Sequence, residues 1–406
     1  MTERSQVRAA QSTDGTSDRR TEGPLAGTLV LDLSTVGPAT RCTRLLADYG
    51  ARVVKLGPPP KAGATPLVPP FHAYSGQRGL ERAQIDLKAP AGRDAFLRLA
   101  SRADVVVESF RPGVVDRLGI GYAAVRVVNP GIVYCSTSGY GQDGPYATRA
   151  GHDLDYLATG GYLHMSGRDG DGRPPLPGAT VADIAAGGLH AAAAVLAALV
   201  GRATTGEGAH LDVAVAEGVL WMLSLYVDEY LATGEAPGPG HYVLTGRYAC
   251  YDVYPAGDGG WLAVAAIEPV FWANLCRLLG LDRWIEHQTD DDAQDVIRAD
   301  LRSALAARGR DEWVALLADA DTCVAPVLTI PEVVDDPQVA ARGSVVRATH
   351  PDRPPFRQLG PLLAGTPRRA TYALPDATVT DTVDLLAGAG LGPDEIDALA
   401  AEGVIA

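Results

Sequence analysis

Two segments of the chain place an acid–base side chain where a helix is expected to begin. His152 lies in Gly-His-Asp-Leu-Asp-Tyr, and Asp183 lies 31 residues later in Ala-Asp-Ile-Ala-Ala-Gly-Gly. Histidine exchanges protons near neutral pH, and an apolar pocket can bring a carboxyl group into the same range. Such a pair suits chemistry that removes a proton from carbon and returns one.

Both residues also have ordinary structural interpretations. A histidine beside a turn is often only hydrogen-bonded there, and an aspartate ahead of an apolar helix often caps it or offsets its dipole. Residue type and spacing alone therefore leave the catalytic and the structural interpretation open. The elements that position the two side chains bear on the choice.

Composition predicts a globular protein with two domains. The chain has 406 residues, 47% hydrophobic and 21% charged. A formal charge of −14 without a basic stripe argues against nucleic-acid binding. Five cysteines without C-x-x-C spacing indicate free thiols in a reducing compartment and no zinc site.

The N-terminus and the apolar segments predict a cytoplasmic protein without membrane contact. The first 22 residues are polar and lack the apolar core of a signal peptide, so a disordered tail is expected. The most apolar stretch, 189–200, is shorter than the roughly twenty residues that span a bilayer.

Strand and helix patterns alternate through the first part of the chain. The predicted strands are 29–33, 52–56, 104–108 and 132–136, and the predicted helices are 39–49, 91–102 and 122–128. Near-continuous Val, Ile and Leu strands with helices between them indicate a parallel sheet covered on both faces. The predicted fold class is therefore α/β, with a large Rossmann-like parallel-sheet domain and a smaller α/β domain.

A Rossmann-like sheet does not by itself imply a dinucleotide. The turn after the first strand lacks G-x-G-x-x-G, and the one match, at 139–144, is followed by Pro145 and polar residues instead of a helix. We therefore predict a loop there.

The second half of the chain no longer alternates strands and helices regularly. A helix is predicted from Asp183 to about Val200, and residues 201–208 are expected to end it. The further predicted elements are a helix over 213–231, a hairpin of 247–254 with 261–267, and helices at 270–279, 293–307, 311–317, 380–386 and 394–402. The predicted domains are a tail over 1–22, the large domain over 23–232, a linker over 233–246, the small domain over 247–331, and a segment over 332–406 that returns to the large domain.

Several segments, in this order, resemble the class III CoA-transferase (CaiB/BaiF) family from about Gly23 to at least Arg342. The resemblance rests on these motifs: Leu-Leu-Ala-Asp-Tyr-Gly-Ala-Arg-Val-Val-Lys at 45–55, Ile-Asp-Leu-Lys at 85–88, Glu-Ser-Phe-Arg-Pro-Gly at 108–113, Gly-His-Asp-Leu-Asp-Tyr at 151–156 and Ala-Ala-Ile-Glu-Pro at 265–269. It implies the interlocked-dimer fold of that family, a large domain that binds coenzyme A, and an acyl-CoA thioester as substrate.

Within the family, the chain is similar to the α-methylacyl-CoA racemase branch. That branch carries His, Asp and Glu at the positions of His152, Asp183 and Glu268. Transferases share the aspartate, which forms an acyl anhydride, but typically carry a Gly-rich loop where this chain has 265–268. The resemblance implies that His152 and Asp183 exchange protons with opposite faces of the thioester α-carbon through an enolate, and that Glu268 orients or tunes His152.

The resemblance also implies where coenzyme A binds. The expected contacts are Ile85, Asp86, Leu87, Lys88, Ser109, Phe110, Arg111, Arg117, Gly151, Asp153, Leu154, Asp155 and Tyr156. Arg111 and Arg117 are the phosphate candidates because guanidinium groups bind phosphate oxygens in pairs, although a solvated surface arginine is the alternative. A backbone N–H near Asp153 or Leu154 is the candidate donor to the enolate oxygen. No cofactor beyond the CoA moiety of the substrate, and no metal, is expected.

The chain departs from the family pattern beside the nucleotide. The arginine that often follows the second strand falls within Leu-Gly-Pro-Pro-Pro at 56–60, so its contact is lost or passes to Lys55 or Lys61. Asp155 replaces a common asparagine beside His152.

The resemblance implies an interlocked homodimer with the site between the large domain of one subunit and the small domain of the other. Glu268 would then come from the partner chain. Two other readings stay open: a CoA-transferase with Asp183 as nucleophile and a structural His152, and a catalytically silent acyl-CoA-binding or scaffold protein.

Overall fold

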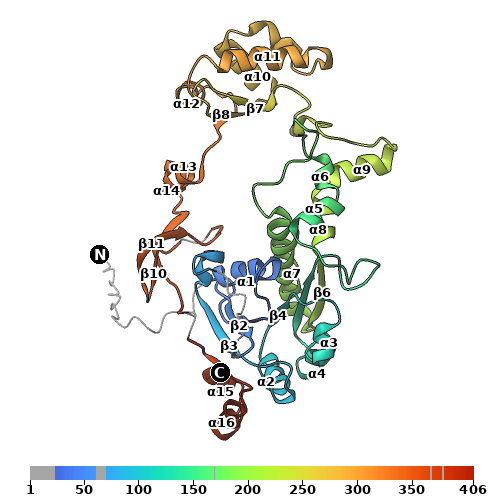
Figure 1. The fold of residues 1–406 in the computed structure, drawn as a ribbon, viewed down its shortest axis with the longest axis vertical. Coiled ribbons are helices and arrows are strands. Elements are labelled where there is room, and N and C mark those ends of the chain that lie inside the picture. The colour runs from blue at the N-terminus through green and yellow to red at the C-terminus, as the bar shows by residue number, and fades with distance from the viewer. Residues whose placement is uncertain (1–22, 61–69, 169, 366–367, 377–378) are drawn as a thin grey trace, which may run out of the picture. The chain divides into compact units, whose positions relative to one another are not determined.

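The computed structural model describes residues 23–60, 70–168, 170–365, 368–376 and 379–406 (Figure 1). The predicted tail at 1–22 and Lys61 lie outside the described residues. The chain forms two compact units. Unit 1 comprises Met1–Ala150, Ala182–Gly218 and Gly343–Ala406, and unit 2 comprises Gly151–Val181 and Val219–Arg342.

Unit 1 is built on a six-stranded parallel sheet of order β3-β2-β1-β4-β5-β6. Its strands are β1 (Leu29–Asp32), β2 (Arg52–Gly57), β3 (Leu80–Gln84), β4 (Val105–Glu108), β5 (Val133–Ser138) and β6 (Ala209–Ala214). The strand order reverses between β1 and β4, where doubly wound folds bind ligands beyond the carboxyl ends of the strands. The predicted α/β class and parallel sheet are confirmed.

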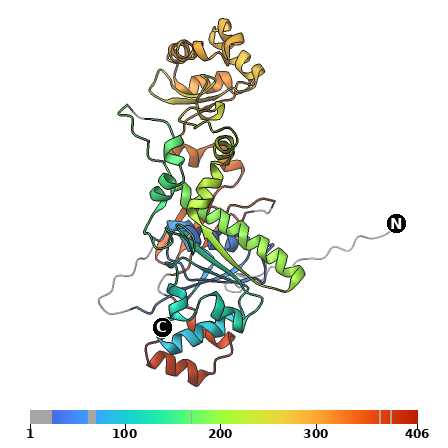
Figure 2. The same ribbon diagram turned by 90° about the vertical axis from the view of Figure 1, so that its right-hand side faces the viewer.

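Helices cover both faces of this sheet. One face carries α1 (Pro38–Asp48), a π-helical segment (Ala182–Leu189) and α7 (His190–Thr205). The other face carries α2 (Pro90–Ala100), α3 (Val114–Leu118), α4 (Tyr122–Val128), α15 (Thr382–Gly388) and α16 (Pro393–Ala401). Figure 2 shows α7 running along the sheet. The C-terminal helices, in red, lie at the lower end of this view and belong, like α2, to the opposite face of the sheet.

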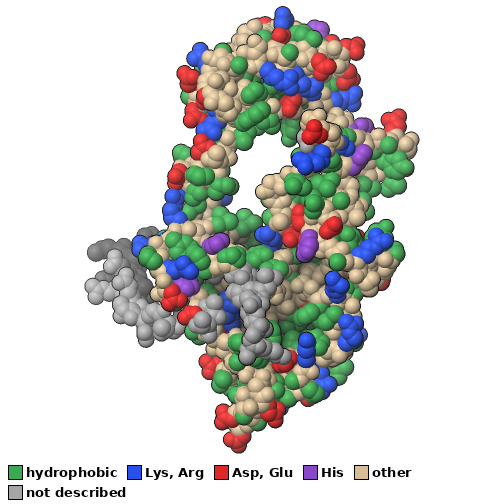
Figure 3. Space-filling view, viewed as in Figure 1, with side chains coloured by type: hydrophobic (Ala, Val, Ile, Leu, Met, Phe, Trp, Pro, Cys, Tyr) green, Lys and Arg blue, Asp and Glu red, His purple; other side chains and the backbone are tan. Residues whose placement is uncertain are grey.

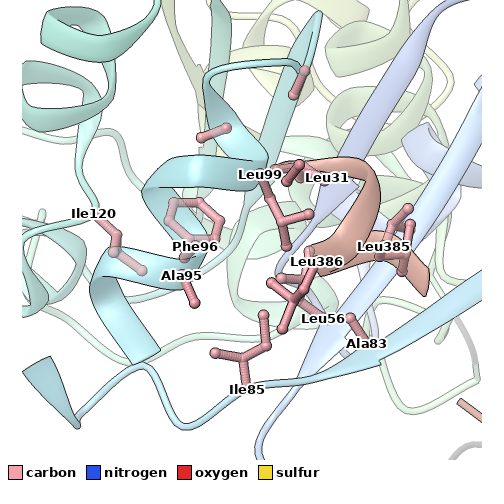
Figure 4. Packing of buried hydrophobic residues seen from close by; sticks show 14 of the residues in the cluster. Leu31, Leu56, Ala83, Ile85, Ala95, Phe96, Leu99, Ile120, Leu385 and Leu386 are labelled. Atoms are coloured by element: carbon pink, nitrogen blue, oxygen red, sulfur yellow. The ribbon is translucent and has the colours of Figure 1, made fainter. Parts of the chain in front are cut away.

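The core of the second face joins the two ends of the chain. Phe96 and Leu99 of α2 point toward Leu386 of α15 and Leu31 of β1 in one buried cluster (Figure 4). The last residues also cover the exposed edge of β3, because Ile85 pairs with Ile405 in an antiparallel bridge. An edge strand closed in this way cannot pair with another chain.

The final helix of unit 1 is acidic on its outer side. Acidic side chains gather over α16 in Figure 3, and Asp394 and Glu395 occupy its first turn. Carboxylates there stabilise the positive end of the helix dipole.

Unit 2 contains a small antiparallel sheet of β7 (Tyr251–Pro255), β8 (Trp261–Ala265) and β9 (Val324–Pro326). Helices α10 (Pro269–Leu279), α11 (Gln294–Leu305) and α12 (Arg310–Leu317) bury Trp272, Ile297 and Trp313 with it. The other helices of the unit are α5 (Asp153–Thr159), α6 (Tyr162–Met165), α9 (Ser224–Thr233), α13 (Ile330–Asp335) and α14 (Pro337–Ala341), with 3-10 turns at Val243–Thr245, Asp282–His287 and Asp291–Ala293. The predicted hairpin is confirmed.

The structure corrects three expectations about secondary structure. Residues 213–231 are not one helix: they begin as β6, continue as α8 (Val215–Met222) and restart as α9. Gly201 lies inside α7, and Gly206, with φ +74°, ends the helix instead. The prediction from sequence also lacked β3, a 3-10 turn at Ala73–Gln77, and a three-stranded sheet. The strands of that sheet are β10 (Val345–His350), β11 (Arg353–Leu359) and β12 (Thr371–Ala373).

The continuous helix over Ala182–Thr205 is longer than the sequence indicated. By length and composition alone its 24 residues could cross a membrane. Core helices pass the same test, and Ala191, Ala192 and Val195 are buried against the sheet.

Candidate active site

His152 stands at the N-terminal end of α5 in unit 2, with an exposed side chain. Its backbone N–H donates to Oδ2 of Asp155 over 2.9 Å, and the hydroxyl of Tyr156 donates to the carbonyl oxygen of Gly151 over 2.6 Å. The aspartate that replaces the common asparagine therefore holds the turn beneath the histidine.

Asp183 lies in the first turn of the π-helical segment, half-buried in unit 1. Glycines press this segment against the start of α1. A Cβ atom on Gly187 would lie 2.7 Å from Cβ of Pro38, and one on Gly188 would lie 2.8 Å from Cβ of Arg41. Only glycine allows this approach, and π-helical turns recur at functional sites. The packing fixes Asp183 relative to α1, which follows β1 at the switch point.

Glu268 is the residue before α10 in unit 2, and its side chain is exposed. The segment that carries it is fixed by Gln288, whose Nε2 donates to the carbonyl oxygens of Ala266 (3.0 Å) and Ile267 (2.7 Å). No sequence motif pointed to Gln288, because it lies in an irregular segment twenty residues downstream of Glu268. Its two hydrogen bonds make it the support of the Glu268 turn.

A buried ion pair occupies the carboxyl ends of β1 and β2. Nζ of Lys55 lies 2.9 Å from Oδ2 of Asp32 and also donates to the hydroxyl of Thr40 over 3.0 Å. Thr43 donates to the same carboxylate over 2.5 Å. Because Lys55 is committed to this network, its ammonium group does not replace the nucleotide contact of the missing arginine.

The predicted CoA contacts of unit 1 follow β3 and β4 at the carboxyl edge of the sheet. Lys88, Ser109, Arg111 and Arg117 are exposed. The side chain of Ile85 is buried in the core (Figure 4), so only its main chain can face a ligand.

The loop after β4 is held close to Arg117. A Cβ atom on Gly113 would lie 3.3 Å from Nη1 of Arg117, and Gly113 itself has φ +77°. The guanidinium group therefore folds back over the loop that carries Phe110 and Arg111. Two cationic side chains are thus available around one short loop.

Glu108 is a residue that sequence reasoning left without a role. It ends β4 with 1% of its surface exposed, and burial raises the pKa of its carboxyl group to about 7. The motif Glu-Ser-Phe-Arg-Pro-Gly contains it, but a motif does not show that the side chain turns inward.

The described residues thus divide the predicted site by unit. Asp183 and the contacts at 85–88, 109–111 and Arg117 belong to unit 1, whereas 151–156 and Glu268 belong to unit 2. Among the residues that the structure describes, no group of three or more His, Cys, Asp or Glu side chains could hold a metal ion.

Comparison with known proteins gives consistent relatives. Residues 25–377 match the model of CoA-transferase family III. The α-methylacyl-CoA racemase of Homo sapiens is 34% identical over 383 residues, covering 94% of this chain and 97% of that protein. The acetyl-CoA:oxalate CoA-transferase of Acetobacter aceti is 32% identical over 348 residues, covering 82% and 88%. The crystal structure of a CAIB/BAIF family protein from Brucella suis superimposes with a TM-score of 0.74 at 28% identity, covering 90% of this chain and 99% of that one.

Proposed function

Because the chain belongs to CoA-transferase family III, we propose that it is an acyl-CoA racemase or epimerase. The reaction is a 1,1-proton transfer at Cα of a 2-methylacyl-CoA thioester. The observation that carries the proposal is the placement of an exposed histidine and a half-buried aspartate at the starts of two helical segments, in a chain similar over nearly its full length to α-methylacyl-CoA racemases.

The proposed mechanism uses two bases. One of His152 and Asp183 takes the α-proton, and the other donates a proton to the opposite face of the resulting enolate. The roles exchange with the configuration of the substrate, so a single site works in both directions. Glu268 orients His152 or tunes its charge.

The enolate oxygen needs a hydrogen-bond donor in the transition state. The backbone N–H groups of Asp153 and Leu154 belong to the first turn of α5, at the positive end of the helix dipole, which favours a developing negative charge. We assign this role to them. The CoA phosphates are assigned to Arg111 and Arg117, since both are exposed around one loop.

A homodimer, working in the cytoplasm, is part of the proposal. Large apolar side chains are exposed on α8 and α9, at Leu220 (48%), Trp221 (77%), Leu225 (51%) and Leu231 (74%). Apolar surface of this kind commonly marks an interface. Trp221→Glu is expected to convert a dimer to a monomer in analytical ultracentrifugation, and a monomeric wild-type chain would contradict this part of the proposal.

The second candidate is a CoA-transferase in which Asp183 attacks the thioester and forms an acyl anhydride. The likeness to transferases at similar identity favours it. It predicts exchange of CoA between a thioester and a free carboxylate, with no loss of the α-proton.

One experiment separates the candidates. The protein is incubated with a 2-methylacyl-CoA in D2O, with and without an acceptor acid, and deuterium at Cα and CoA transfer are followed. We expect deuterium at Cα and loss of stereochemistry without an acceptor. His152→Ala and Asp183→Ala should both abolish the loss of stereochemistry, and each should leave exchange at most for the enantiomer whose α-proton faces the remaining base, whereas the exposed His164 can be replaced by Ala as a matched control.

Retention of the Cα hydrogen under both conditions would contradict the racemase proposal. CoA transfer would then favour the transferase. Thioester binding without either reaction would indicate an acyl-CoA-binding protein.

A further inference from the structure

A buried carboxyl group lies directly beneath the loop assigned to the CoA phosphates. Oε2 of Glu108 accepts a hydrogen bond from the backbone N–H of Phe110 over 2.7 Å. Glu108 pairs with Ser136 across β4 and β5, and the side chain of Ser136 lowers the pKa of the Glu108 carboxyl group. Thr137 donates to the carbonyl oxygen of Glu108 over 3.2 Å. The side chain therefore ties the loop to the sheet.

The carboxyl group has a hydrogen-bonded connection to the surface. Oγ of Ser136 lies 3.1 Å from Nε2 of His210 on β6. His210 is exposed and stacks on Tyr122, with ring centroids 4.8 Å apart. A hydroxyl group can pass a proton between a carboxyl group and an imidazole, because it both donates and accepts. Glu108 is thus buried, and its cross-strand neighbour Ser136 contacts an exposed imidazole.

The groups around Glu108 favour its neutral form. Burial is the main cause of its raised pKa, and Asp116 from α3 and Asp212 from β6 raise it further. The hydrogen bonds from Ser136 and Phe110 act in the opposite direction. Tyr134 and Cys135, the other titratable groups on β5, have pKa values raised chiefly by burial and next by Glu108 itself.

On the other side of Ser136, burial lowers the pKa of His210, while Asp212 and Asp116 raise it. The exposed cations closest along the chain, Arg111 and Arg117, belong to the loop and to α3.

We propose that Glu108 is a positioning residue whose protonation is coupled to the binding of coenzyme A by the loop over 109–113. Anionic phosphates that arrive on this loop disfavour a carboxylate beneath it, so the complex takes up a proton from solvent. By linkage, the affinity for CoA then falls as pH rises through the range in which Glu108 ionises. This inference rests on the assignment of the loop to CoA under the proposed function.

The experiment is a calorimetric titration of the full-length protein with free coenzyme A. Proton uptake is obtained from the binding heats in two buffers that differ in ionisation enthalpy. A rise of one pKa unit from about 7 corresponds to uptake of about half a proton at pH 7.5 and to an affinity about tenfold lower at high than at low pH. We expect Glu108→Gln to remove this uptake while it keeps the volume of the side chain and an oxygen for the N–H of Phe110.

Two further variants test the arrangement. Ser136→Ala removes a hydrogen bond that favours the carboxylate, so the midpoint of the pH dependence should move upward. Glu207→Gln is the control, because Glu207 is exposed ahead of β6, at the amino end of the strand. On binding coenzyme A, the Glu207→Gln variant should take up the same number of protons as the wild-type protein. Protons released or taken up by the phosphates of CoA itself are common to all variants.

The outcomes separate this inference from the proposed function. A wild-type chain that does not bind coenzyme A overturns both. A chain that binds it with the same proton uptake in wild type and Glu108→Gln overturns only the coupling. A Glu108→Gln variant that lacks the uptake and has a urea midpoint no lower than that of wild type supports it.

Discussion

The position of Asp183 depends on a contact that a single methyl group can disturb. In Gly187→Ala the new Cβ would lie 2.7 Å from Cβ and 2.9 Å from Cγ of Pro38, and 3.1 Å from Cγ2 of Val215. Carbon atoms prefer separations of about 3.5–4.0 Å, so the π-helical segment must move from α1 by roughly 1 Å. Overpacking of this kind costs about 1–3 kcal/mol of stability.

The same displacement should affect catalysis. A shift of about 1 Å in a positioned group commonly costs about a hundredfold in rate. We therefore expect Gly187→Ala to reduce the rate of deuterium incorporation at Cα by roughly 10–100-fold, with the urea midpoint lowered. The rate of deuterium incorporation should be divided by the folded fraction of the protein, so that unfolding and a slower reaction are measured separately.

Gly201→Ala is the matched control in the same helix. Nothing lies within 4 Å of a Cβ atom at Gly201, which is exposed inside α7. The substitution should stabilise the helix by up to about 1 kcal/mol and leave exchange unchanged. If Gly187→Ala exchanges label at the wild-type rate with full stability, the close packing of the π-helical segment does not position Asp183.

Three further outcomes follow from the structure. Lys55→Met leaves Asp32 charged and fully buried, so the free energy of unfolding should fall by about 3–5 kcal/mol in urea titrations; a loss below about 1 kcal/mol would refute the ion pair's role. The pKa of Glu108 is raised to about 7 in the folded chain, so the folded state keeps this proton longer than the unfolded state and stability falls as pH rises from about 4.5 to 7. Glu108→Gln should therefore gain up to about 3 kcal/mol relative to wild type between about pH 5 and pH 8, and equal unfolding curves for the two proteins at both pH values would contradict this. Gln288→Ala removes two hydrogen bonds from the turn before Glu268 and should cost about 1–2 kcal/mol in thermal unfolding together with a several-fold loss of kcat; an unchanged kcat would show that the turn holds without it.

The strands that the sequence predicted are those buried on both faces. β1, β2 and β4 are rich in Val and Leu, and β5 begins at Val133 directly after the apolar Ile132, so hydrophobicity predicted all four. β3 reads Leu-Glu-Arg-Ala-Gln and lies at the sheet edge, where the C-terminal residues cover it. It pairs with β2, but its polar residues give no hydrophobic strand pattern, and the residues that cover its free edge lie more than 300 positions away in sequence.

The second edge strand, β6, was also missed in the prediction from sequence, for a related reason. His210 and Asp212 alternate with apolar residues over a segment that runs directly into α8. Apolar residues from 213 onward fit a helix equally well, and only pairing with β5 decides between the two. The end of α7 was misjudged because a glycine can either sit within a helix or terminate it. The left-handed backbone of Gly206 marks the actual end.

In the candidate site, too, local sequence did not reveal the side chains whose role depends on distant parts of the chain. Motifs pointed to His152, Asp183 and Glu268, because these residues stand in short segments that resemble one family. Gln288 acts through its side-chain amide on distant carbonyl groups, and the burial of Glu108 arises from neighbouring strands. Such supporting groups follow from tertiary structure and not from local sequence.

The division of the site between the units bears on the choice of reaction. Asp183 serves both proposed chemistries, as base or as nucleophile, and its placement depends on unit 1 through α1. His152 and Glu268, to which the proposed function assigns the difference between proton transfer and CoA transfer, both belong to unit 2 and precede the helices α5 and α10. Under that proposal, a change of reaction class would involve two turns of unit 2, and the parallel sheet and the loop assigned to CoA would stay as they are. Variants at His152 and Glu268 should accordingly lose exchange and keep their affinity for coenzyme A, whereas variants at Arg111 and Arg117 should lose affinity first.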